Sequence, residues 1–143
     1  SMLISADMWR RYFKPRMRKI IGAIRAESED VVIAYHSCGS IYPIIGDLIE
    51  IGIQVLNPIQ ESAAGMNQRR IKDEYGDRLT LMCGLDTQTF LLQATPEEVY
   101  SEMQKKAREL SRGGGYIAAV SHTIQHDVPT QNLSALLEAL NNL

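Results

Sequence analysis

The chain has 143 residues, of which 45% are hydrophobic, and its 15 basic and 17 acidic residues leave a formal net charge of -2. This composition excludes an intrinsically disordered chain and supplies enough apolar material for one hydrophobic core, so we expect residues 1–143 to form a single domain. No apolar run approaches the roughly 18 residues of a membrane span, and because no charged-then-apolar leader with a small-residue cleavage site opens the chain, we expect no signal peptide. We therefore expect a cytoplasmic protein with no membrane partner.

The first predicted element is a helix over residues 7–26, which we expect Pro15 to kink or split. Its basic residues could indicate a surface that binds nucleic acid. Its apolar residues fall largely on one face, however, and this favours an outer helix that packs one side and solvates the other. We therefore expect no nucleic-acid partner. The apolar residues are Met8, Tyr12, Met17, Ile20, Ile21 and Ile24.

Four short apolar runs, typical of parallel strands buried on both faces, alternate with four further helices. The strands are predicted at 31–35, 55–57, 79–83 and 116–120, and the helices at 41–51, 67–75, 95–111 and 132–140. The clearest helix start is a capping box, in which Thr95 is the N-cap and Glu98 the third helical residue. This alternation predicts an α/β fold with parallel strands. It fits either a small open sheet or half of a TIM (β/α)₈ barrel.

Metal-ligating side chains stand at the strand ends, where both architectures place ligands. His36 and Cys38 follow the first strand, Cys83 ends the third, and His122 follows the fourth. Imidazole and thiolate are preferred zinc ligands. A curled sheet would bring His36, Cys38 and one of the other two together, with a fourth position open. The alternative is structural: a hydrogen-bonded His36 and a merely packed Cys38.

Other polar side chains at the strand ends are candidates for binding a small-molecule substrate. Asp86 has two equally weighted roles, because its carboxylate could contact substrate as a ligand or base, or could cap the loop that follows it. The candidate substrate-binding residues are Asn57, Gln60, Asp86 and Gln125.

Five segments together resemble the uroporphyrinogen decarboxylase superfamily. They are HSCGS at 36–40, LNPIQ at 56–60, GLDTQ at 84–88, TPEEV at 95–99 and GGYI at 114–117. In order and spacing they are similar to the C-terminal half of that family's barrel, strands five to eight, preceded by the helix after strand four. The resemblance implies that the chain is a partial barrel domain, a fragment that lacks the N-terminal half.

The resemblance also implies a branch of the superfamily. The decarboxylases of haem synthesis lack the His-x-Cys found at 36–38, whereas this motif resembles two zinc ligands of the corrinoid-dependent methyltransferases. In those enzymes the metal lowers the pKa of a thiol that receives a methyl group. Where they have a third cysteine ligand, this chain has His122, in a segment that also resembles the Gly-His-Gly of the decarboxylases.

We therefore expect a zinc-dependent methyltransferase that moves a methyl group between a corrinoid, held by a partner protein, and a small acceptor or donor. Uroporphyrinogen decarboxylation in porphyrin biosynthesis is the alternative, and a non-catalytic half-barrel is the second alternative. Because unpaired strand edges favour association, we expect a homo-oligomer or an assembly with a separate N-terminal half.

Overall fold

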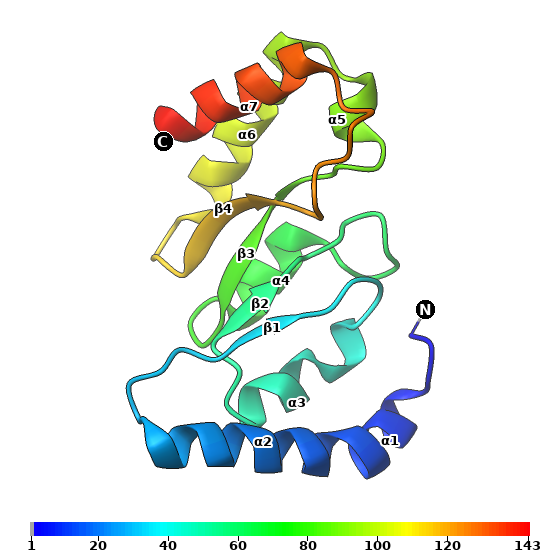
Figure 1. Ribbon diagram of the computed structural model, residues 1–143, viewed down its shortest axis with the longest axis vertical. Helices are drawn as coiled ribbons and strands as arrows, with labels where there is room; N and C mark the ends of the chain where they lie inside the picture. The colour runs from blue at the N-terminus through cyan, green and yellow to red at the C-terminus, as the bar shows by residue number, and fades with distance from the viewer. Residues whose placement is uncertain (1) are drawn as a thin grey trace.

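A sheet of four parallel strands, in the order β1-β2-β3-β4, organises the fold (Figure 1). The structure, a computed structural model, describes residues 2–143, so Ser1 of the predicted 1–143 domain lies outside the described residues. The strands are β1 (Ala34–His36), β2 (Val55–Asn57), β3 (Thr80–Leu85) and β4 (Tyr116–Val120). The helices are α1 (Ala6–Met8), η1 (Trp9–Phe13), α2 (Lys14–Glu27), η2 (Tyr42–Ile44), α3 (Ile45–Glu50), α4 (Gln68–Tyr75), α5 (Phe90–Gln93), α6 (Pro96–Leu110) and α7 (Thr130–Asn141). The predicted α/β class, with four strand-then-helix units, is confirmed.

The register of the sheet decides which side chains share a face. His36 lies level with Asn57, and Leu56 lies level with Leu81. Because successive side chains of a strand alternate between faces, His36 and Asn57 share one face while the two leucines share the other. Both leucines are fully buried in the core formed with the helices, whereas His36 is exposed. One face of the sheet is therefore covered, and the other is open around His36.

The covered face carries two apolar clusters. In the first, Leu48 of α3 and Ile71 of α4 pack with the side chains of β2 and β3. In the second, Met103 of α6 and Leu136 of α7 pack beside the end of β3. Complete burial of such a side chain contributes about 1.5 to 3 kcal/mol each to the free energy of folding. These contacts fix the strand ends relative to one another.

The capping box predicted at residue 95 is present. The Thr95 hydroxyl accepts a hydrogen bond from the Glu98 N–H at 3.3 Å, and the Glu98 carboxylate accepts one from the Thr95 N–H at 2.8 Å. These bonds satisfy two of the amide groups that a helix start leaves unpaired. The predicted start of this helix is therefore confirmed, whereas the short helix α5 was not predicted.

The first helix is interrupted near Pro15, as predicted, but the extent of its buried face was predicted wrongly. A π-helical turn, η1, ends at Phe13, two residues before Pro15, whose missing N–H cannot donate a helical hydrogen bond. Its buried side is narrower than the predicted apolar face and consists of Trp9 and Ile21, with Met17 half-buried. Within residues 2–143 no element packs over the other apolar side chains. Those exposed residues are Met8, Tyr12, Ile20 and Ile24.

The prediction of a first strand at 31–35, buried on both faces, is also wrong. The strand begins at Ala34 and runs to His36, and Val32 before it is 61% exposed. The reason is position in the sheet, because β1 pairs with β2 alone and is an edge strand. A β-branched apolar run predicts a strand but not whether neighbours cover it.

Candidate metal centre

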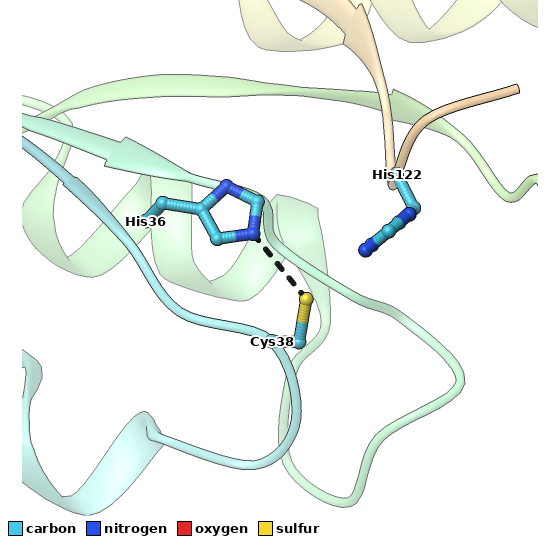
Figure 2. Close-up of side chains that lie close together, drawn as sticks. All are labelled: His36, Cys38 and His122. Carbon is cyan, nitrogen blue, oxygen red and sulfur yellow. Dashed lines mark hydrogen bonds between the residues drawn. The ribbon is translucent and has the colours of Figure 1, made fainter.

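Three potential metal ligands meet at the open face of the sheet. His36 ends β1, Cys38 stands two residues further on, and His122 stands two residues after β4. One ligating atom from each side chain lies within 4.8 Å of the other two, and no other such cluster occurs within residues 2–143. Figure 2 shows His122 reaching from the end of β4 toward His36 and Cys38. The structure thus brings together the three residues that the strand ends suggested.

The two histidines meet although they come from opposite edges of the sheet. His36 ends β1 and His122 lies in the loop after β4, and these edge strands are three strand spacings apart, or about 14 Å in a flat sheet. Their ring centroids are nevertheless 6.3 Å apart, with the rings inclined at 74°. The two side chains therefore reach toward each other over the open face of the sheet (Figure 2).

Hydrogen bonds from Asn57 of β2 and from Gln60 after this strand hold His36 and the loop that carries Cys38. The Asn57 side-chain oxygen lies 2.7 Å from Nδ1 of His36, and the Asn57 amide nitrogen donates to the Met82 carbonyl at 3.0 Å. The Gln60 side-chain oxygen accepts a bond from the Gly39 N–H at 2.8 Å. The loop that carries Cys38 is therefore tied to the segment after β2.

Sγ of Cys38 and Nε2 of His36 are 3.5 Å apart. Both side chains and that of His122 are exposed, so an ion could reach all three from solvent. Two ligands of a tetrahedral zinc lie about 3.5 Å apart, given the usual Zn–N and Zn–S bond lengths. This pair of donors therefore already has the spacing that zinc requires.

Cys83, the alternative ligand suggested by its place at a strand end, lies elsewhere. Its side chain is fully buried in the first apolar cluster, on the covered face of the sheet. Burial raises the pKa of its thiol to about 12. The reason is alternation along β3: Met82 is the residue that faces the open side, beside Asn57, and Cys83 faces the helices.

Two of the candidate substrate-binding residues, Asp86 and Gln125, make local contacts. One oxygen of Asp86 accepts bonds from the Thr89 hydroxyl at 2.6 Å and from the Thr89 N–H at 2.7 Å, at the start of α5. Burial, the largest single effect, would raise the pKa of this carboxyl, but the hydrogen bonds from Thr89, Phe90 and Gln88 together outweigh it and lower the pKa. Gln125 is exposed and donates to the Thr123 carbonyl at 3.3 Å in the loop after β4.

Two hollows flank the cluster and offer room for a small molecule. One, of about 430 Å³, is lined by Cys38 and Gln60 together with apolar residues that include Trp9. The other, of about 470 Å³, is lined by His36 and His122 and by leucines of α7. No lysine or arginine is among the described residues that line either hollow. Both walls are mainly apolar.

A comparison with protein families matches the chain over its whole length. The family model described as Uroporphyrinogen decarboxylase (URO-D) matches residues 1–143. The chain belongs to this family. The predicted superfamily is confirmed, and the strand-then-helix units of this uroporphyrinogen decarboxylase family member are those of its barrel.

Relatives with two different activities are similar to this family member. A uroporphyrinogen decarboxylase of Pelodictyon phaeoclathratiforme is 25% identical over 140 residues, which cover 94% of this chain and 37% of the relative. The methylcobamide:CoM methyltransferase MtaA of Methanosarcina barkeri is 23% identical over 137 residues, which cover 96% of this chain and 37% of the relative. The chain thus spans little more than a third of the length of either relative.

A solved structure has the same fold. A methyltransferase from Methanosarcina mazei superimposes with a TM-score of 0.71 at 25% sequence identity, and the match covers 98% of this chain and 38% of that one. The four strand-then-helix units of this family member therefore correspond to part of a larger protein.

Within residues 2–143, no helix is both long enough and apolar enough to cross a lipid bilayer.

Proposed function

We propose that this chain carries the metal-binding part of a zinc-dependent methyltransferase, which moves a methyl group between a corrinoid and a small acceptor or donor. The observation that carries the proposal is the cluster of His36, Cys38 and His122, whose ligating atoms lie within 4.8 Å of one another. The similarity to MtaA and to the Methanosarcina mazei methyltransferase supports it. The corrinoid, in this proposal, is presented by a partner protein.

The chemistry of the three donors fits zinc. Two imidazoles and one thiolate are all ligands that zinc prefers, and three protein ligands leave the fourth position open for a substrate, as in catalytic zinc sites. Bound zinc would act as a Lewis acid that lowers the pKa of a coordinated thiol. A set with one cysteine donates less charge than a set with two, so this site would activate its substrate more as a Lewis acid than as a thiolate-rich centre.

The chain's own residues then have separate tasks. His36, Cys38 and His122 would hold the metal, while Gln60 holds the loop of Cys38 through the Gly39 N–H. The apolar hollows beside the cluster would exclude water from the reacting atoms and receive the body of the substrate. The absence of lysine and arginine among the described residues of their walls favours a substrate whose buried part is uncharged.

Metal content tests the proposal. We expect the 143-residue chain, purified without a histidine tag, to hold about one zinc ion. Cys38→Ser should lose the zinc, whereas the matched control Cys83→Ala should keep it, because Cys83 lies in the core. In cobalt-loaded protein, a sulfur-to-cobalt charge-transfer band should disappear in Cys38→Ser alone. Metal-free wild-type protein that takes up neither ion would contradict the proposal.

Decarboxylation of a porphyrinogen is the second candidate, and four relatives with that name favour it. In this case the exposed His122 would contact the substrate directly rather than a metal. Titration with uroporphyrin, a stable oxidised analogue, separates the two candidates. The decarboxylase role predicts binding that is lost in His122→Ala and unchanged in Cys38→Ser, and absence of binding would count against it.

A further inference from the structure

Asn57 connects the candidate ligand His36 to the backbone of the sheet by hydrogen bonds. It ends β2 and is half-buried between His36, which ends β1, and Met82 in β3. Its side-chain oxygen lies 2.7 Å from Nδ1 of His36, and its amide nitrogen lies 3.0 Å from the Met82 carbonyl oxygen. One amide group thus connects three neighbouring strands at the open face.

The chemistry of the carbonyl fixes the direction of both hydrogen bonds. A main-chain carbonyl only accepts, so the NH₂ of Asn57 must face Met82 and its oxygen must face His36. The side-chain oxygen of Asn57 also only accepts hydrogen bonds. Nδ1 of His36 must therefore carry the hydrogen of this bond and donate it to Asn57. In neutral imidazole, Nε2 is then left with its lone pair free.

Nε2 is the nitrogen that faces the cluster. It lies 3.5 Å from Sγ of Cys38, whose thiol can donate to the lone pair while no metal is present. Figure 2 shows this contact and the position of His122 beyond it. The same lone pair is the one that a metal would use. A histidine whose second nitrogen donates to a fixed oxygen is held in both tautomer and ring orientation.

We infer that Asn57 is a positioning residue that fixes the tautomer and the ring of His36, so that Nε2 is the ligating nitrogen. The sequence predicted a substrate contact for Asn57, and the positioning role is a different one, in which His36 engages its oxygen and Met82 its NH₂. The consequence for metal affinity rests on the proposed function, whereas the tautomer of His36 is a property of the chain by itself.

The tautomer is measurable without any metal. The chain contains three histidines, His36, His122 and His126, so two-bond nitrogen-proton correlation spectra of ¹⁵N-histidine protein are assignable with single His→Gln variants. We expect neutral His36 to carry its proton on Nδ1 in the wild-type chain and in Asn57→Asp, which keeps an accepting oxygen. We expect a mixture of tautomers in Asn57→Leu, which lacks the acceptor. A proton on Nε2 in the wild-type chain would overturn the inference.

Zinc titration supplies the second readout. We expect Asn57→Leu to bind zinc roughly 10 to 100 times more weakly than wild type, in the range usual for loss of a group that orients a ligand. The control is Asn67→Ala, which removes the N-cap of α4 and should leave both the tautomer and the zinc affinity unchanged. Equal zinc affinity in Asn57→Leu and wild type would overturn the positioning role. If wild-type protein bound no zinc, the proposed function would fail, and the tautomer spectrum would still decide the role of Asn57.

Discussion

At the scale of single residues, the two oxygens of Asp86 have different surroundings. Oδ2 accepts hydrogen bonds from the hydroxyl and N–H of Thr89 and a longer one, at 3.4 Å, from the Phe90 N–H. Oδ1 is buried and has no hydrogen-bond partner among the described residues. Of the two roles that the sequence left open, the structure therefore shows the cap at the start of α5.

This cap predicts a pH-dependent stability. The pKa of Asp86 is lowered in the folded state, so its stabilisation is complete above the unfolded pKa and disappears as the pH falls through the folded pKa. We expect Asp86→Ala to lower the free energy of unfolding by about 1 kcal/mol at neutral pH. In urea unfolding, the difference in unfolding free energy between wild type and Asp86→Ala should narrow below about pH 4. A difference that stays constant down to about pH 2 would contradict this assignment.

For the candidate metal centre, the sequence predicted which residues come together better than it predicted the contacts that each one makes. His36, Cys38 and His122 were found because ligating residues at the ends of parallel strands must lie at one edge of a sheet. Cys83 was placed with them wrongly, since its side depends on the alternation along β3. The hydrogen bonds from which we infer a role for Asn57 were also missed, because a hydrogen bond across strands depends on the register, which spacing along one chain does not reveal.

At the scale of elements, Gly84 of β3 pairs with Ala119 of β4 and has no room for a side chain. A Cβ added there would lie 2.0 Å from the Ala119 carbonyl oxygen, and this oxygen belongs to the backbone of the paired strand. Gly84 begins the GLDTQ segment that suggested the family. Its place in that segment therefore has a steric reason, independent of any contact with substrate.

We expect Gly84→Ala to lower the free energy of unfolding by about 3 kcal/mol or to prevent folding, because the strands must separate to admit the methyl group. The matched control is Gly46→Ala in α3, where no atom lies within 4 Å of the added Cβ. That change should stabilise the protein by roughly 0.5 to 1 kcal/mol, since alanine is the better helix former. Thermal unfolding followed by circular dichroism measures both, and equal melting temperatures for the two variants would refute the steric argument.

Local signals predicted most of the elements. The capping box at Thr95 and the strands at 55–57 and 116–120 depend on neighbouring residues, and the structure has each of them as predicted. Val32 and one side of α2 are exposed because, within residues 2–143, no element lies beyond β1 to cover them. An apolar pattern indicates that a face can pack, not that this chain supplies the neighbour.

At the scale of the whole molecule, the sheet has two free edges and one open face. Within residues 2–143, β1 and β4 each pair with one strand only, and Ile117 of β4 is 44% exposed. Unpaired edges with apolar residues beside them favour association with another chain. We propose that the chain assembles with a second copy or with a separately supplied N-terminal half.

Sedimentation velocity tests this assembly. We expect the chain alone to form a dimer or larger species in a concentration-dependent manner, and Ile117→Lys to shift the distribution toward monomer by placing a charge beside the β4 edge. Ser111→Lys adds the same charge in the exposed loop after α6, and it should leave the distribution unchanged. A single monomeric species at every concentration would show that the free edges do not drive association.

The meeting of His36 and His122 also has a mechanical consequence. A metal ion bound to both side chains would cross-link the first strand of the sheet to the segment after the last, across 86 residues of chain. A ligand that binds only the folded sheet stabilises it by an amount that grows with the logarithm of the ligand concentration, about 4 kcal/mol at a thousand times its dissociation constant. Bound metal would therefore make the two edges of the sheet separate less readily.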